Sequence, residues 1–183
     1  MENENATPSF MNHAGKHALI LGGISVVLTL AAYAIDYTLL AAMSFLLISL
    51  AIYIGYGIYA GINYRNEIGG YLSFGKAFQH GFVVFAVSAL VSTIFNILLY
   101  TVIDPELPAK VTEAAMENAE KMMAGFGMPE DQMEEALEKT KEDTIKRYTA
   151  GGLAMSYGFT LIGCAIFALI SGAIAKRKEP ETL

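Results

Sequence analysis

Four long stretches of the sequence contain no Asp, Glu, Lys or Arg, and they restrict the fold more than any other feature. They run at about 17–35, 39–64, 78–103 and 151–175. A helix of about 20 apolar residues crosses the ~30 Å hydrocarbon core of a bilayer. Only helices and closed barrels satisfy their backbone groups in lipid, and these stretches lack the polar–apolar alternation of barrel strands. The sequence therefore predicts an all-α membrane protein with four transmembrane helices.

The charged residues are concentrated between the third and fourth stretches. Charged residues make up 16% of the chain and hydrophobic residues 54%, whereas a soluble domain carries roughly a quarter charged residues. Residues 104–148 hold 18 of the 30 charged side chains, so the remainder cannot cover a water-exposed surface. A single cysteine, Cys164, excludes an intrachain disulfide and a cysteine zinc cluster. The lipid bilayer is therefore the first expected partner.

Residues 104–148 are predicted to form an acidic helical hairpin outside the membrane. Asp104-Pro105-Glu106 favours a helix start, because Asp caps free amide groups and Pro fits the first helical turn. Residues 125–129 interrupt the helical spacing and precede a second helix start. The second arm leads into the fourth span at 149–175, where Gly151 and Gly152 permit a bend.

The distribution of Lys and Arg predicts the orientation of the spans. Four spans place the tails at 1–16 and 176–183 on the same side as the connection at 65–77. That side holds six basic and five acidic residues, and the opposite side holds six basic and thirteen acidic residues. Because cytoplasmic loops are enriched in Lys and Arg, we expect both termini in the cytoplasm and the hairpin outside it.

The first span is expected to stay as a membrane anchor. Ala32-Tyr33-Ala34 imitates a signal-peptidase site, but Glu2, Glu4 and a lone Lys16 do not make a basic leader.

No motif for catalysis, cofactor binding or metal binding is present. The sequence lacks H-E-x-x-H, P-loop, G-x-S-x-G and dinucleotide-binding patterns. The match to S-x-x-K at 73–76 lacks its companion motifs. His17 and His80 lie near the starts of predicted spans, which favours interfacial or helix-bonded histidines over a proton relay. The basic run at 176–178 favours a stop-transfer signal, so nucleic acid is not an expected partner. We expect a protein that is not an enzyme.

Small residues mark candidate helix-packing faces. Gly57 and Gly61 form a GxxxG pair in the second span, and Ala154 and Gly158 form a similar pair in the fourth. Such pairs let helix backbones approach closely. They predict packing among the four spans, with self-association as the alternative.

Two groups of residues are candidate contacts for a partner or for lipid. Methionine is adaptable and common on binding faces, and the hairpin contributes Met122, Met123 and Met133. The alternative for these methionines is loose helix–helix packing. The second group lies in the connection before the third span and consists of Gly69, Gly70, Tyr71, Phe74, Lys76 and Phe78.

Two distinctive stretches flank the third apolar helix. They are GGYLSFGKAF at 69–78 and YTVIDP at 100–105. With the four-span plan and the charged helical insert, they make the chain resemble domain of unknown function family 4199 over most of its length. The resemblance implies a four-span bacterial inner-membrane protein of the Bacteroidota type with a periplasmic hairpin. It supplies no catalytic residue.

These features favour a non-enzymatic accessory or assembly subunit whose hairpin contacts a membrane-protein partner. The alternative is a small homo-oligomeric transporter or channel. The partner, the substrate and the oligomeric state do not follow from the residues.

Overall fold

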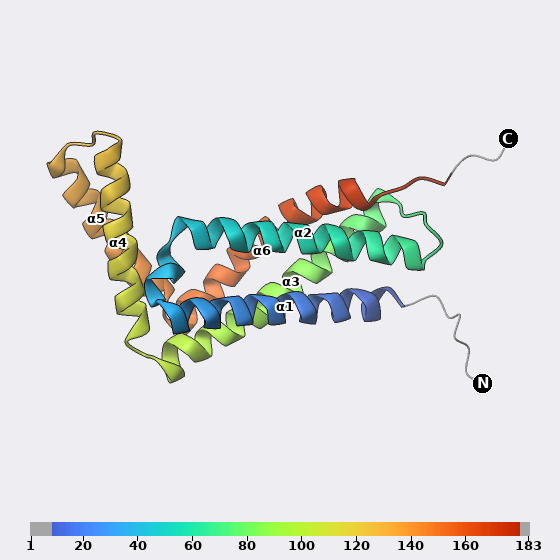
Figure 1. The fold of residues 1–183 in the computed structure, drawn as a ribbon, viewed down its shortest axis with the longest axis horizontal. Coiled ribbons are helices and arrows are strands. Elements are labelled where there is room, and N and C mark those ends of the chain that lie inside the picture. The colour runs from blue at the N-terminus through green and yellow to red at the C-terminus, as the bar shows by residue number, and fades with distance from the viewer. Residues whose placement is uncertain (1–8, 180–183) are drawn as a thin grey trace. The chain divides into compact units, whose positions relative to one another are not determined.

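The structure is a computed structural model that describes residues 9–179, apart from the side chains of Lys139 and Glu142. Residues 1–8 and 180–183 of the predicted cytoplasmic tails lie outside the described residues. The described chain is helical and contains no β-strand (Figure 1). Its elements are α1 Phe10–Ile35, the 3₁₀ helix η1 Tyr37–Ala41, α2 Met43–Glu67, α3 Phe74–Leu98, the π-helix η2 Leu99–Ile103, α4 Leu107–Gly125, α5 Glu130–Arg147 and α6 Ala150–Ala175.

The predicted membrane protein with four spans is confirmed. Four helices are long and apolar enough to cross a bilayer. They are α1 with 26 residues, α2 with 25, α3 continued by η2 with 30, and α6 with 26. Two of these helices begin earlier than the apolar stretches do. Helix α1 begins at Phe10 instead of near residue 17, and α3 begins at Phe74 instead of 78. The added turns carry residues that pack inside the protein, such as His13 and Ala77, so helix length here follows packing as well as hydropathy.

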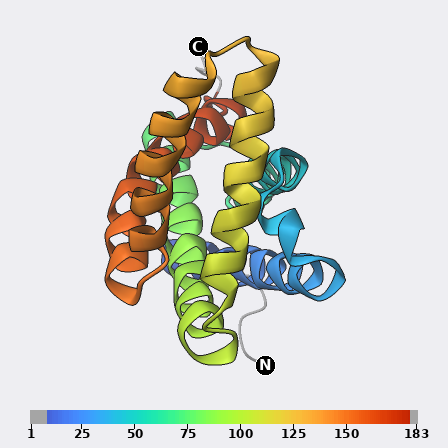
Figure 2. The same cartoon turned by 90° about the vertical axis from the view of Figure 1, so that its left-hand side faces the viewer.

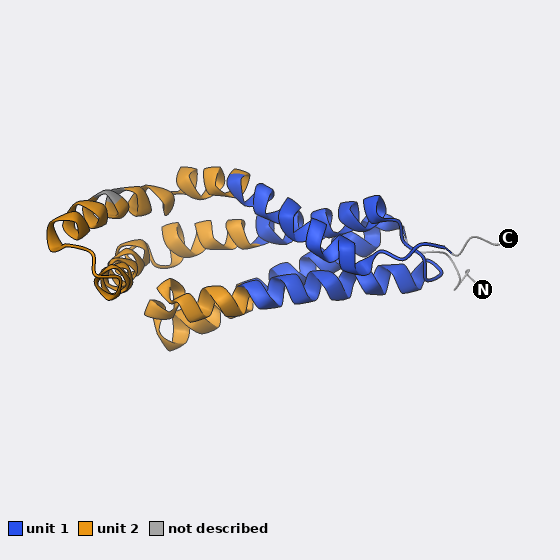
Figure 3. Cartoon of the chain, turned by 90° about the horizontal axis from the view of Figure 1, so that it is seen from above, with its two compact units in different colours: residues 1–25, 50–91, 159–183 blue, residues 26–49, 92–158 orange. Residues whose placement is uncertain are grey.

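The chain divides into two compact units, coloured separately in Figure 3. The first unit combines residues 1–25, 50–91 and 159–183, and the second combines residues 26–49 and 92–158. The first unit therefore contains one end of each span, and the second contains the other ends together with α4 and α5.

The core of the first unit is filled by large apolar side chains and closed by a tight connection. Phe85 and Leu21 are fully buried. Between α2 and α3 the chain turns through Gly69 and Gly70, whose φ angles of +100° and +87° suit glycine best. The next buried residue, Leu72, exchanges two backbone hydrogen bonds of 2.9 Å with Arg177. The connection is thus fixed to the segment that follows α6.

The core of the second unit surrounds the junction between η2 and α4. Leu99, Tyr100, Leu107 and Val111 are buried there, with Tyr148 packed against them. Burial raises the pKa of the Tyr148 phenol. Asp104 caps α4, because its Oδ1 accepts hydrogen bonds from the backbone N–H groups of residues 106 and 107 at 3.1 and 3.0 Å. The helix itself begins at Leu107, three residues after the predicted start.

Helix α5 does not continue straight into α6. The chain leaves the helix after Arg147, and the Thr149 Oγ1 accepts a 3.0 Å hydrogen bond from the Gly152 N–H, which caps α6. A Cβ atom on Gly152 would meet the Lys146 carbonyl oxygen and the Arg147 backbone. The absence of a side chain at residue 152 therefore permits the close turn between the hairpin and the fourth span.

Candidate functional site

Helices α4 and α5 form an antiparallel hairpin between the third and fourth spans (Figures 1 and 2). The turn between them contains Gly127 in a left-handed conformation with φ of +74°, and Pro129 lies at the N-terminus of α5. Acidic residues Glu130 and Asp131 occupy the first turn of α5, and Lys146 and Arg147 occupy its last turn. Both placements complement the helix dipole, so the charges stabilise a helix that few apolar contacts support.

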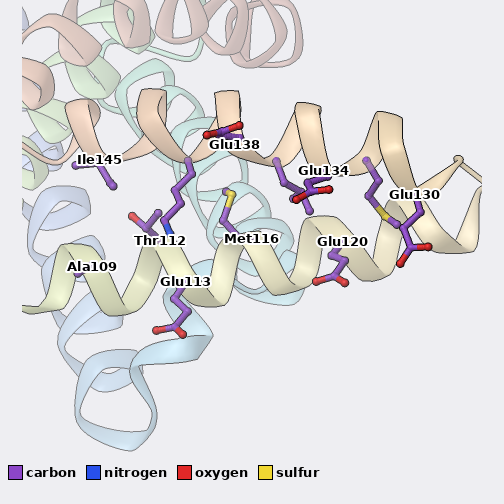
Figure 4. Close-up of a pocket in the computed structure, with 12 residues that line it drawn as sticks. Ala109, Thr112, Glu113, Met116, Glu120, Glu130, Glu134, Glu138 and Ile145 are labelled. Atoms are coloured by element: carbon purple, nitrogen blue, oxygen red, sulfur yellow. The ribbon is translucent and has the colours of Figure 1, made fainter.

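A groove of about 880 Å³ runs between α4 and α5. Its apolar residues are Met116, Met133, Leu137 and Ile145, together with Ala109. Figure 4 shows Thr112 and Met116 of α4 directed toward α5, whereas Glu113 points away from it. The two helices therefore leave an apolar channel between them that their own side chains do not fill.

The edges of this groove are acidic. Glu113, Glu120, Glu130, Glu134 and Glu138 line it, together with one cation, Lys141. Among the side chains that the structure describes, none of these five glutamates forms an ion pair. The groove therefore carries more negative than positive charge around its apolar residues.

Two groups of charges on α4 are paired locally and away from the groove. The Lys110 Nζ lies 3.3 Å from Glu106 and 3.9 Å from Asp104, and the Glu106 hydrogen bond raises the pKa of Lys110. The Lys121 Nζ donates a 2.6 Å hydrogen bond to Glu117 and lowers its pKa. These pairs are exposed and contribute little to stability.

A second groove of about 740 Å³ lies between α4 and the start of α2. It is almost entirely apolar, with Leu40, Phe45 and Leu46 on one side and Ala119 and Met122 on the other. Met122 is 52% exposed. No charged residue lines this groove, so its chemistry suits an acyl chain or an apolar side chain.

A family model described as protein of unknown function, DUF4199, matches residues 16–177. The chain belongs to the DUF4199 family. The matched residues include most of α1, the other three spans, the 69–78 stretch and the hairpin. No curated protein and no solved structure matches the chain.

The predicted methionine contacts of this DUF4199 protein lie on different surfaces. Met133 lines the acidic groove and Met122 lines the apolar one. Met123 is half-buried and lines neither groove. The structure thus separates three residues that sequence reasoning had grouped.

The second predicted contact group, in the connection before α3, lies beside Lys176 and Arg177, which follow α6. Gly69 and Gly70 make the turn, Lys76 is exposed and Phe78 stacks on Phe82 with ring centroids 6.1 Å apart. The exposed rings of Tyr71 and Phe74 are covered in part by the cations of Arg177 and Lys176, at 6.0 and 5.8 Å from the ring centroids. These cations thus occupy part of the surface that was expected to contact a partner or lipid.

The two predicted helix-packing pairs behave differently. A Cβ atom on Gly57 would collide with the Phe85 ring, and one on Gly61 would lie 2.9 Å from the Ala175 Cβ. This pair therefore packs inside the first unit against α3 and α6. Ala154 is exposed, and a Cβ atom on Gly158 would meet nothing within 4 Å. That face of α6 is open within the second unit.

The largest feature that sequence reasoning missed is a histidine cluster in the first unit. His80 is fully buried and the His13 Nδ1 lies 2.8 Å from its Nε2. The His17 ring stacks beside His13 with centroids 4.4 Å apart. Of the two roles expected for His80, interfacial or helix-bonded, the structure shows the second, because His80 is buried and bonded to His13 of α1. The four-residue spacing of His13 and His17, which places both on one helix face, was the available signal.

Proposed function

We propose that this DUF4199 protein is a non-enzymatic accessory or assembly subunit of a bacterial inner membrane, with both termini cytoplasmic. In this proposal the hairpin lies outside the cytoplasm and binds a basic amphipathic helix of a membrane-protein partner. The observation that carries the proposal is the groove between α4 and α5, which combines an apolar channel with five glutamates that form no ion pair with any side chain the structure describes.

The dimensions and chemistry of the groove support a helical occupant. An apolar channel between two helices accepts the apolar stripe of a third helix, read as anchors at i, i+3, i+4 and i+7. Methionines such as Met116 and Met133 adapt to an irregular partner face. The acidic edges favour Lys and Arg on the partner and disfavour acidic segments, because charge complementarity supplies specificity and on-rate.

The packing of the first unit supports the same proposal. Its centre is occupied by fully buried Leu21, Val84 and Phe85, and the Gly57–Gly61 pair is used for contacts within the chain. A filled core of this kind suits a scaffold that holds a binding element at the membrane. The proposed orientation rests on the acidic hairpin and the basic residues at the opposite ends of the spans.

The test is crosslinking and affinity purification of a tagged copy from native membranes in mild detergent. Glu134→Lys combined with Glu138→Lys reverses charge in the groove. Glu135→Lys combined with Asp143→Lys reverses the same number of charges on α5 at residues that do not line it. We expect one stoichiometric partner with the wild type and the control, and its loss with the groove variant.

Two outcomes would contradict the proposal. Equal partner recovery with both double variants would show that the groove is not the binding surface. Recovery of only self-crosslinked copies would favour a homo-oligomeric transporter or channel, which flux measurements in liposomes would then test.

A further inference from the structure

The apolar groove between α4 and the start of α2 lies where a membrane span meets the charged hairpin. Helix α2 is one of the four helices that are long and apolar enough to cross a bilayer, whereas α4 is not. Both walls of the groove belong to the second unit, and α4 packs against η1, the short helix that precedes α2. The groove is therefore formed within one compact unit, beside the end of a span.

Each wall of the groove is one face of a helix. The wall on α4 has the spacing i, i+3, i+4 and i+7 and consists of Ala115, Asn118, Ala119 and Met122. The wall at the start of α2 has the same spacing and includes Ala42, Phe45, Leu46 and Ser49. Residues with this spacing share one side of a helix. Other residues of α4 line the acidic groove, so α4 presents a different face to each groove.

The lining of the apolar groove suits hydrocarbon better than an extended peptide. Two polar side chains, Asn118 and Ser49, take part in it. The Asn118 Nδ2 donates a 3.3 Å hydrogen bond to the Ala41 carbonyl oxygen, which holds α4 against η1, and the Ser49 Oγ is buried. An extended peptide would bring backbone N–H and C=O groups into surroundings that leave them unpaired, which is costly. A hydrocarbon chain has no such groups.

The groove is continuous with the lipid-facing surface of α2. Met43, Leu46 and Leu47 are each more than half exposed, and Leu46 also lines the groove. A membrane span lies in the hydrocarbon core of the bilayer, so acyl chains cover this exposed surface. Those chains therefore reach the mouth of the groove without leaving the membrane.

A groove of this chemistry is expected to be filled in a bilayer. Its volume of about 740 Å³ lies within the ~300–1,000 Å³ of sites that hold small molecules. Water does not occupy an apolar cavity stably, and an empty cavity loses the dispersion contacts of the atoms that line it. The acyl chains beside α2 are the apolar molecules at hand.

Helix α4 has the residue pattern of a helix that lies on a lipid surface. Phe126 follows Met122 by one turn, since its N–H donates to the Met122 carbonyl oxygen, and its side chain is 84% exposed. Charges such as Glu113 and Glu120 lie on the face that lines the acidic groove. Helices at the membrane interface combine a face of large apolar residues with a charged face. The exposed ring at the end of the helix thus extends the apolar wall toward lipid.

We propose that the apolar groove holds one acyl chain of a phospholipid from the surrounding bilayer. The chain lies between α4 and the start of α2, in contact with Met122 and Leu46, and fixes the base of the hairpin at the membrane surface. This site is independent of the partner proposed for the acidic groove, because no residue lines both grooves.

The test is photo-crosslinking of the full-length protein in phosphatidylcholine nanodiscs. The probe is a phosphatidylcholine with a diazirine on one acyl chain, and mass spectrometry of the digested protein locates the adducts. We expect adducts at 43–49 of α2 and at 115–122 of α4, and none on α5. Exposed apolar residues of α6, such as Phe159 and Ile162, provide the reference for ordinary lipid contact.

Two variants of α4 separate occupation of the groove from contact with its surface. Ala119→Phe adds a ring inside the groove, and Ala124→Phe adds the same ring at an exposed residue that lines neither groove. Ala119→Phe is expected to lower the ratio of α4 to α6 adducts about tenfold, because the ring takes the place of the chain. Ala124→Phe is expected to leave this ratio unchanged. Both variants are expected to retain the partner of the acidic groove.

Three results would overturn the proposal. Absence of α4 adducts beside normal α6 adducts would assign the groove to an apolar segment of a partner or of a second copy of the chain. Adducts as frequent on α5 as on α4 would show contact with the whole hairpin instead of one groove. Equal α4 yields in both variants would show that acyl chains do not enter the groove. The wild-type pattern is decisive without the variants, so a variant that fails to fold does not block the test.

Discussion

The first unit buries its histidines in a hydrogen-bonded network, whereas the hairpin of the second unit leaves its glutamates exposed. His13 and His80 are 5% and 0% exposed, and each is bonded to a neighbour. The five groove glutamates have no ion pair within the described side chains. Polar groups in an apolar surrounding must be paired, because an unpaired one costs its full desolvation energy. Groups in water can stay unpaired because water itself satisfies them.

The largest difference between the two regions is expected when a phenylalanine side chain is removed from each of them. Phe85 is fully buried between α2 and α6, and Phe126 in the hairpin turn is 84% exposed. Phe85→Ala is expected to lower the free energy of unfolding by about 3 kcal/mol, because it leaves a cavity beside Gly57. Phe126→Ala is expected to change it by less than about 0.5 kcal/mol. Equilibrium unfolding in detergent micelles checks both, and equal effects would contradict the assignment of the core.

The turn between α5 and α6 tests how far the hairpin depends on the span that follows it. Gly152→Ala places a Cβ against the Lys146 carbonyl oxygen, whereas Gly151→Ala meets nothing within 4 Å. We expect Gly152→Ala to lower the free energy of unfolding by about 2 kcal/mol through this clash. Faster hydrogen exchange at residues 146–152 is the accompanying measurement. Gly151→Ala is the matched control and is expected to leave both quantities near those of the wild type.

The smallest effect is expected at an exposed ion pair of the hairpin, Glu117 with Lys121. Lys121 lowers the pKa of Glu117, so this carboxylate contributes stability above its ordinary pKa and loses it as the pH falls through the lowered value. Lys121→Ala is expected to return the Glu117 pKa toward its ordinary value with little change in melting temperature, since the pair is exposed. Carboxyl NMR titration measures the pKa. Lys110→Ala, which removes a cation bonded to Glu106, is the control.

Much of the fold could be predicted from short-range features. The uncharged stretches predicted all four spans, because helix formation in lipid depends on length and composition within one segment. The charged insert and its Pro and Gly residues predicted the two arms of the hairpin, with α4 beginning three residues after the expected start. The exact helix ends were harder to place, since Phe10 and Phe74 extend their helices through contacts that hydropathy does not record.

The candidate sites also depend partly on sequence patterns and partly on tertiary packing. Sequence patterns by themselves determined the four-span helical class, the acidic hairpin and the small-residue pair at Gly57 and Gly61. Only the tertiary structure decided that Glu134 and Met133 border one groove while Met122 borders another. It also brought His13 to Asn63 and His80, which lie 50 and 67 residues away along the chain. The physical reason is that apolar spans show little difference between their faces, so which side chains meet is decided by how the helices pack.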